Sequence, residues 1–450
     1  MIYDLVLRGK YISNGIKKGD IGISNGIIQA IATENQLEGK EVIEYTDEFI
    51  YPGFIDSHVH AYSNPDEGMD RMTAAAAHGG VTTVIDMPYD RPHAINTQEL
   101  FKNKIKDVLD NANVDVALWG TVAKNKGVNE VQKMIDSGAI AFKLSTYETD
   151  PVRFPGIPDN QIKEILKLAT ENEILTAFHA ENEQMIDELV EKFQEEGKTT
   201  PIYHNLSRPP ESETTAVSKL LELAKVDNTK LHLVHISSPD SVKLIELYKE
   251  KFNLDVTYET CYQYLALNTN HLEKYGVLAK CNPALRTPEE SQELLELVKN
   301  GQVDFVTSDH APWIKNKDEK NIFNEASGLT GLDIMIPIMH DFLVNSNELS
   351  ADRFSELFSS HVAERFNLRN KGKIEVGYDA DFAIINPNNS WKLTEDTYLS
   401  LANQSVFNNK TVNSKVVHTI VRGQTIYKND ELVNRHLGTF IPGSGAKTNA

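Results

Sequence analysis

Short apolar runs alternate with amphipathic segments through the middle of the chain. The amphipathic segments have the 3.6-residue period of helices, as in Ile162, Ile165, Leu166 and Ala169. The apolar runs have the length and composition of buried strands. Eight strands that alternate with helices over about 300 residues predict an α/β fold built as a (β/α)8 barrel of the TIM type. The eight runs are Phe54–His60, Thr82–Met87, Asp115–Val122, Ala139–Ser145, Ile174–His179, Leu231–Ile236, Leu254–Thr260 and Asp304–Ser308.

The main alternative with the same pattern is an open, doubly wound sheet. Sheets of that kind that bind nucleotides carry a glycine-rich phosphate loop directly after a strand. Neither a Gly-x-Gly-x-x-Gly motif nor a Walker-type loop follows any of the eight runs. The barrel is therefore the favoured architecture.

Both ends of the chain are rich in short β-type segments. Near the N-terminus, Asn25-Gly26 separates two alternating segments, and this dipeptide favours a hairpin because both residues readily adopt positive φ. Similar segments return only near the other end, so we expect the two termini to form one small β-sandwich domain together. The segments are Tyr3–Arg8, Asp20–Ser24, Ile27–Ala32, Asp381–Ile385, Lys415–Arg422 and Thr425–Tyr427.

These patterns divide the chain into four parts. Residues 1–52 are expected to form the N-terminal part of the small β domain, residues 53–365 the barrel, and residues 366–442 the C-terminal part of the small domain. Residues 443–450 are mostly small and polar, which predicts a flexible tail.

Composition narrows the possible functions. The 450 residues carry a net charge of −20, which disfavours nucleic acids and anionic membrane surfaces, because binding them requires clustered positive charge. No apolar stretch approaches the roughly 18 residues of a membrane span, and the first residues lack a signal-peptide pattern, so we expect a cytoplasmic protein. Two cysteines, Cys261 and Cys281, are too few for a cysteine-based zinc site. Histidines and carboxylates must therefore hold any metal ion.

The residues that suit metal chemistry lie at the carboxyl ends of the predicted strands, where barrel enzymes place their active sites. The two histidines of the first run are two positions apart and face the same side of a strand. Taken alone, each residue has an ordinary structural interpretation, either as a hydrogen-bonded histidine or as a lysine whose ammonium extends to solvent. Their joint placement at one end of one barrel favours a metal site instead. The residues are His58, His60, Lys143, His179, His235 and Asp309.

Several segments, in order along the chain, resemble the motif series of the cyclic amidohydrolases, a branch of the amidohydrolase superfamily. This branch contains allantoinases, hydantoinases, dihydropyrimidinases and dihydroorotases, and the chain looks most like the allantoinases. The resemblance covers nearly the whole chain. The motifs are GFIDSHVH from Gly53, GGVTT from Gly79, FK at Phe142, FHAE from Phe178, VHISS from Val234 and SDHAP from Ser308.

The resemblance implies a centre with two divalent metal ions, which we expect to be zinc. His58 and His60 would bind the first ion together with Asp309, and His179 and His235 would bind the second. A hydroxide between the two ions would attack the amide carbon of a cyclic substrate, and the enzyme would be a hydrolase of carbon–nitrogen bonds in cyclic amides.

The resemblance also implies roles for two single residues. Lys143 would bridge the two ions as a carbamate formed with CO2, and its apolar strand setting favours the neutral amine that this reaction requires. Asp309 would take the proton of the attacking water and deliver it to the leaving nitrogen.

The expected substrate is a neutral cyclic ureide, with allantoin, hydrolysed to allantoate, as the first candidate. Tyr62, Tyr89 and Trp313 stand where dihydroorotases carry the Arg, Asn and His that hold the substrate carboxylate. We therefore expect a cavity without positive charge near the ring substituent, in which Tyr62, Asn282 and Trp313 contact the substrate. Hydantoinase or dihydropyrimidinase activity is the alternative, and dihydroorotase activity is disfavoured.

Other readings of the same resemblance are weaker. Scaffold proteins with this fold lose metal ligands, and deaminases with one metal ion typically lack the bridging lysine, whereas all of these residues are present here. Hydantoinases place an oxyanion-binding tyrosine five residues beyond the bridging lysine, whereas Tyr147 lies four beyond Lys143, so its role is left open. The resemblance further implies a homodimer or homotetramer.

Overall fold

The computed structural model describes residues 1–226 and 229–447, and within these ranges it holds two sheets of eight strands and one of two. The first large sheet is parallel, with its strands in chain order from β5 to β12. The backbone N–H of His60 donates to the carbonyl oxygen of His310 at 3.0 Å, which joins the two edges into a nearly closed barrel. The barrel predicted from the eight apolar runs is therefore confirmed. Its strands are β5 (Phe54–Val59), β6 (Val81–Asp86), β7 (Asp115–Gly120), β8 (Ala141–Ser145), β9 (Leu175–His179), β10 (Leu231–Leu233), β11 (Val256–Cys261) and β12 (Phe305–Thr307).

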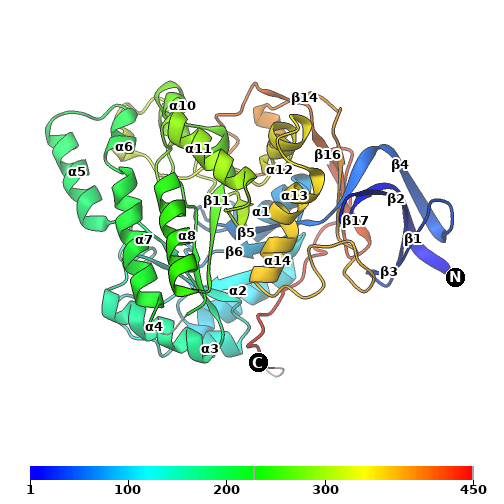
Figure 1. Cartoon of the computed structure of the whole chain (residues 1–450), viewed down its shortest axis with the longest axis horizontal. Helices are drawn as coiled ribbons and strands as arrows, with labels where there is room; N and C mark the ends of the chain where they lie inside the picture. The colour runs from blue at the N-terminus through cyan, green and yellow to red at the C-terminus, as the bar shows by residue number, and fades with distance from the viewer. Residues whose placement is uncertain (227–228, 448–450) are drawn as a thin grey trace.

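Helices surround the parallel strands, and α7, α8 and α11 lie side by side on the outside of the barrel (Figure 1). In α4 the predicted apolar face is buried, with Ile162 and Ile165 inaccessible to solvent. In the described ranges no helix has the length and apolar character that crossing a membrane requires. The helices are α1 (Gly68–His78), α2 (Gln98–Asn111), α3 (Val131–Asp136), α4 (Asp159–Glu171), α5 (Glu183–Glu195), α6 (Ile202–Leu206), α7 (Pro210–Ala224), α8 (Pro239–Phe252), α9 (Tyr262–Ala266), α10 (Thr269–Tyr275), α11 (Pro288–Lys299), α12 (Met335–Met339), α13 (Ala351–Ser355) and α14 (His361–Arg365), with short helical turns η1 (Gly276–Ala279), η2 (Ile322–Asn324), η3 (His340–Asn345), η4 (Glu356–Ser360) and η5 (Glu395–Thr397).

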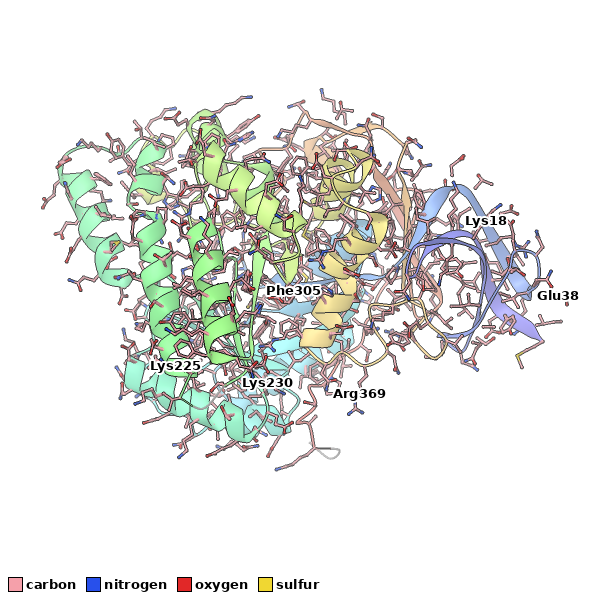
Figure 2. The ribbon with its side chains drawn as sticks, in the orientation of Figure 1. Lys18, Glu38, Lys225, Lys230, Phe305 and Arg369 are labelled. Atoms are coloured by element: carbon pink, nitrogen blue, oxygen red, sulfur yellow. The ribbon has the colours of Figure 1, made fainter. Side chains whose placement is uncertain are left out.

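The second large sheet is mixed and combines strands from both ends of the chain, as the sequence predicts. Its order is β18-β17-β16-β13-β4-β1-β2-β3, and Asn25 and Gly26 both have positive φ in the hairpin between β2 and β3. Figure 2 places the exposed Lys18 and Glu38 on this sheet, away from the barrel helices. The strands are β1 (Ile2–Ile12), β2 (Ile16–Ser24), β3 (Ile27–Ala32), β4 (Glu38–Pro52), β13 (Phe382–Asn386), β16 (Lys415–Val421), β17 (Gln424–Lys428) and β18 (Glu431–Leu432), while β14 (Trp391–Lys392) and β15 (Thr411–Val412) pair separately.

Strand β4 holds the two halves of the mixed sheet together, because it pairs in parallel with β1 and antiparallel with β13. The apolar pattern did not predict this strand. Its first half is largely charged and solvent-exposed, so it lacks the alternation of a half-buried strand.

A buried ionic cluster attaches the mixed sheet to the barrel. The Lys371 ammonium lies 2.6 Å from Asp115, 2.9 Å from Asp379 and 2.7 Å from Asp381. Asp115 begins β7 in the barrel, and Asp381 immediately precedes β13. The three carboxylates lie close enough together to hold a metal ion, but the ammonium of Lys371 already occupies the space between them.

The end of the described chain returns to the barrel. The backbone N–H of Gly443 donates to the carbonyl oxygen of Gly138 at 3.0 Å, and that of Lys447 donates to Asp136 at 3.0 Å. The segment expected to form a flexible tail is thus hydrogen-bonded as far as residue 447, and residues 448–450 lie outside the described residues.

Candidate metal and active site

A cavity of about 430 Å³ opens at the carboxyl ends of the barrel strands. It is lined by every residue that the sequence analysis proposed as a metal ligand. They come from the ends of five strands, with His58 and His60 both at the end of β5, because each parallel strand delivers its last residues to the same rim. The ligand candidates in the lining are His58, His60, Lys143, His179, His235 and Asp309.

The first ligand cluster consists of His58, His60 and Asp309. The Nε2 atoms of His58 and His60 lie 3.2 Å and 3.4 Å from Oδ1 of Asp309. Ligand atoms around a tetrahedral zinc ion lie about 3.3 Å apart when each bond is about 2.0 to 2.1 Å long. The three side chains therefore have the donor atoms and the spacing that a divalent cation requires.

The second cluster consists of His179 and His235. Nδ1 of His179 lies 2.8 Å from Nε2 of His235, so one nitrogen of each ring faces the same point. The rings of His235 and His58 have centroids 5.4 Å apart, which places the two clusters next to each other. His235 and Asp309 both have positive φ, of 41° and 46°, so the backbone turns at the two strand ends that supply them.

Lys143 is buried on β8 within the same cavity. Its Nζ atom lies 5.4 Å from the centroid of the Tyr89 ring and 5.5 Å from that of Phe154. Burial lowers the pKa of Lys143 to about 7, although the nearby carboxylates of Asp309 and Glu259 act in the opposite direction. A substantial fraction of the amine is therefore neutral near pH 7, unlike an ordinary lysine side chain.

The profile of the amidohydrolase family matches residues 49–426 of this sequence. The chain belongs to the amidohydrolase family. It is 32% identical over 445 residues to an allantoinase of Rubrobacter xylanophilus, covering 98% of this chain and 97% of that protein, and 32% identical over 438 residues to an allantoinase of Salmonella choleraesuis, covering 95% and 96%. The solved L-hydantoinase (dihydropyrimidinase) of Arthrobacter aurescens superimposes with a TM-score of 0.93 at 29% identity, covering 98% of this chain and 100% of that one. These relatives place the amidohydrolase in the cyclic amidohydrolase branch.

Two buried glutamates of this amidohydrolase orient the candidate ligands. Oε1 of Glu259 lies 2.6 Å from Nδ1 of His58, and Oε2 of Glu181 lies 2.7 Å from Nε2 of His179. A carboxylate that accepts one ring N–H fixes the tautomer and leaves the other nitrogen free to bind a metal ion. Arg208 in turn donates to Glu181 at 2.6 Å.

Neither glutamate was predicted to be functional. A signal was nevertheless present, because Glu259 interrupts the seventh apolar run, and a carboxylate is rarely buried without a partner. In the structure Glu259 is inaccessible to solvent, and its second oxygen lies 3.0 Å from the Ser57 hydroxyl and 3.3 Å from Nε2 of His232.

Glu259→Gln is expected to weaken metal binding by about 10-fold to 100-fold, the usual effect of losing a partner of a metal-binding histidine. The amide keeps the shape of the side chain but is a weaker acceptor for the His58 N–H. Metal affinity, measured by chelator competition, checks this. Glu293→Gln, in an exposed ion pair with Lys243, is the control and should leave affinity unchanged. Equal affinities of Glu259→Gln and the parent protein would contradict the positioning role.

The proposed substrate contacts are only partly brought together. Asn282 and Trp313 line the cavity, whereas Tyr62 is absent from the described residues that line it. The Tyr62 hydroxyl instead donates to Asp107 at 2.6 Å, so this ring faces α2. Tyr147 does line the cavity, and the Arg208 guanidinium lies 4.7 Å from its ring centroid.

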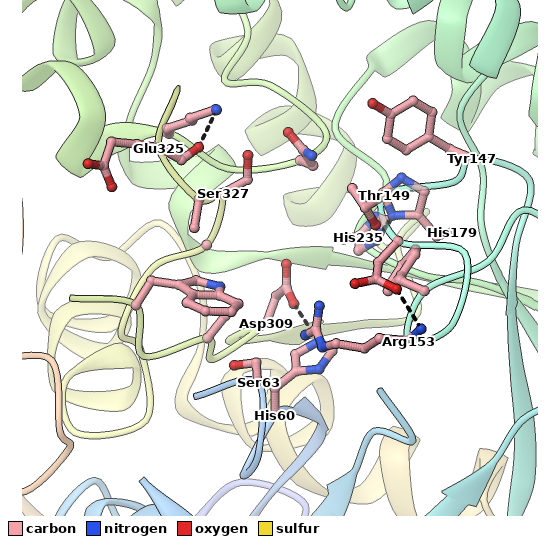
Figure 3. A pocket seen from close by; sticks show the side chains of 18 of the residues that line it. His60, Ser63, Tyr147, Thr149, Arg153, His179, His235, Asp309, Glu325 and Ser327 are labelled. Carbon is pink, nitrogen blue, oxygen red and sulfur yellow. Dashed lines mark hydrogen bonds and ion pairs between the residues drawn. The ribbon is translucent and has the colours of Figure 1, made fainter. Parts of the chain in front are cut away.

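The cavity also contains positive charge that the sequence analysis did not expect. Arg91 and Arg153 line it, and Figure 3 shows the Arg153 side chain extending towards His60 and Asp309. The lining therefore contains cations, contrary to the expectation of a cavity wall without positive charge. Both arginines lie in loops, after β6 and after β8, and strand periodicity carries no information about the path of a loop.

Proposed function

We propose that this amidohydrolase opens a cyclic ureide by hydrolysing a ring carbon–nitrogen bond, with allantoin, converted to allantoate, as its first substrate. One observation carries the proposal: six residues with ligand chemistry converge at the strand ends around one cavity, and a buried lysine is among them. The near full-length similarity to allantoinases supports allantoin over other rings.

Two divalent cations, with zinc the ion best suited to the donor set, would be held by the two clusters. His58, His60 and Asp309 would hold one ion, and His179 and His235 the other. The Lys143 amine would form a bond to the carbon of CO2 and lose a proton, which gives a carbamate with two oxygens to bridge the ions. When bound, such ions lower the pKa of a coordinated water and polarise a carbonyl oxygen.

Asp309 would act as the general base and then as the general acid. Burial alone would raise the pKa of Asp309, but the neighbouring charges of His58, His60 and Lys143 lower it overall. The carboxylate is therefore ionised at neutral pH and ready to accept the proton of the attacking water. The same proton would then pass to the ring nitrogen as the carbon–nitrogen bond breaks.

Two polar side chains are available to orient the ring. Burial raises the pKa of Tyr147, so its hydroxyl stays protonated and can donate to the oxygen that gains charge during attack. Oδ1 of Asn282 is buried and has no hydrogen-bond partner among the described residues, so it can accept from a ring N–H. We propose that Tyr147 takes the oxyanion role although it lies one position closer to the lysine than in hydantoinases.

The alternative is hydantoinase or dihydropyrimidinase activity, which the likeness to the solved L-hydantoinase favours. The test incubates the metal-loaded enzyme with allantoin, 5-alkyl hydantoins and dihydrouracil, and compares kcat/KM. We expect allantoin to give the highest value. A preference for dihydrouracil would support the dihydropyrimidinase alternative, and failure to open any of these rings would overturn the proposed class of reaction.

A further inference from the structure

Three loops bring two guanidinium groups and an indole ring together in the cavity wall. Arg91 follows β6, Arg153 follows β8, and Trp313 follows β12. The guanidinium carbon of Arg91 lies 4.6 Å from the centroid of the Trp313 ring, and that of Arg153 lies 5.6 Å from it. All three residues line the same cavity as His60 and Asp309.

Neither of these two guanidinium groups has an ionic partner among the described residues. Nε of Arg153 is buried and makes no hydrogen bond there. Asp150 and Asp90 attract the Arg153 guanidinium electrostatically but form no ion pair with it. Asp150 accepts the backbone N–H groups of Val152 and Arg153, each at 2.9 Å, and Asp90 pairs with Lys104 at 2.7 Å. The two arginines therefore present donors to the cavity that nothing on the described chain satisfies.

Another cation in the wall of the cavity is committed to the protein itself. Arg208 pairs with the buried Glu181 at 2.6 Å, as described above. A half-buried guanidinium without a partner is costly, because it loses water without gaining a hydrogen bond. Burial and the neighbouring Arg91 charge lower the pKa of Arg153 to about 10, so the group is still a cation at neutral pH. The contrast with Arg208 indicates that Arg153 is satisfied by a ligand, and the exposed Arg91 lies beside the same indole ring, where it can reach that ligand.

We propose that Arg91, Arg153 and Trp313 bind the substituent on the substrate ring and select a planar arm with oxygen acceptors over an alkyl arm. The inference rests on the proposed function. A guanidinium fork matches a planar carboxylate with two parallel hydrogen bonds, and the oxygen of a ureido group is an acceptor of the same kind. The indole face can stack on either planar group. An alkyl arm would leave both guanidinium groups unpaired, and sites built to hydrogen-bond a substrate reject analogues that lack the partner.

The test compares three hydantoins that differ only in the arm on carbon 5: a ureido group (allantoin), a carboxymethyl group and a 2-methylpropyl group. For the metal-loaded enzyme we expect kcat/KM to be at least about tenfold higher for the two planar arms, mainly through a lower KM. In Arg153→Met the preference for the planar arms should fall about tenfold. The kcat/KM for the hydantoin with the alkyl arm should change little. Arg153→Lys keeps the charge but loses the fork, so part of the carboxymethyl preference should survive and the ureido preference should not.

Control variants and stability measurements separate an effect on substrate preference from a loss of folding. Arg91→Met changes an exposed side chain and should reduce the same preference. Arg435→Met removes a surface ion pair with Asp70 and should leave all three ratios unchanged. Thermal unfolding and metal content are measured for every variant, so that a variant that loses the fold or the metal ions is recognised.

The outcomes separate this inference from the proposed function. Equal kcat/KM values for the three arms, or an equal loss for all three in both Arg91→Met and Arg153→Met, would overturn the selection of planar arms while leaving ring opening intact. If no ring is opened, the proposed function fails. Calorimetric titration of the carboxymethyl and 2-methylpropyl compounds then still tests the inference, because tighter binding of the carboxymethyl compound is expected without turnover.

Discussion

Lys143→Ala is expected to abolish ring opening, with kcat at least about 1000-fold lower, which corresponds to about 4 kcal/mol of activation free energy. The Lys143 side chain lines the same cavity as His179 and His235 of one cluster and Asp309 of the other. Without the proposed carbamate, no bridge would join the two clusters, and the protein should retain no more than one metal ion per chain. Steady-state kinetics and metal analysis of the purified variant check both results.

A rescue experiment separates the loss of the bridge from a loss of folding. A short carboxylic acid supplies the two oxygens that the proposed carbamate would provide, and it is small enough for the space left by the lysine side chain. Added to Lys143→Ala with metal ions, it should restore part of the activity. Full activity of the variant without such an addition, or two metal ions per chain in its absence, would rule out a bridging role.

Asp309→Asn should lower kcat by roughly 100-fold to 10,000-fold, the range for the loss of a general acid or base. The amide has the same shape but cannot accept and return a proton. Because Asp309 also belongs to the first ligand cluster, metal content must be measured alongside kcat, and circular dichroism should show an unchanged fold. Asp240→Asn, on the exposed start of α8, serves as the matched control and should keep full activity.

The kcat of Asp309→Asn alone can refute the proton-transfer role of Asp309. A variant that binds the normal complement of metal ions and keeps more than about a tenth of the wild-type kcat has lost less than about 1.4 kcal/mol, too little for a general base. In that case another group in the cavity would have to move the proton. Loss of metal from Asp309→Asn would establish ligation, and kcat measured at saturating metal would then test the proton-transfer role.

Much of the fold could be predicted because buried strands and amphipathic helices leave different periods in the sequence. The runs beginning at Phe54 and ending at Ser308 correspond to β5 through β12, and Ile27–Ala32 is a strand with the predicted bounds. Strand β4 was not predicted, because its exposed first half is determined by pairing with β1 and not by burial. Pairing between distant segments leaves no local pattern.

The candidate site likewise has a part that the sequence predicts and a part that it does not. The convergence of candidate ligands at strand ends, such as His58 and His179, on one cavity could be predicted because the architecture fixes where strand ends meet. Tyr62 could not be oriented, since its contact with Asp107 depends on how α2 packs. The meeting of Arg91 and Arg153 at Trp313 could not be predicted for a related reason: loops from different strands come together only in three dimensions.

The ionic cluster around Lys371 lies at the opposite end of the barrel from the cavity, because Asp115 begins β7 whereas the ligands follow the other ends of the strands. The contacts that attach the mixed sheet and the loops that line the cavity thus lie at opposite ends of the barrel, although they alternate along the chain. Loops such as those carrying Arg91 and Arg153 can accumulate substitutions without loosening that attachment. A lineage with this architecture can therefore alter the lining of its cavity while keeping the anchor between its two sheets intact.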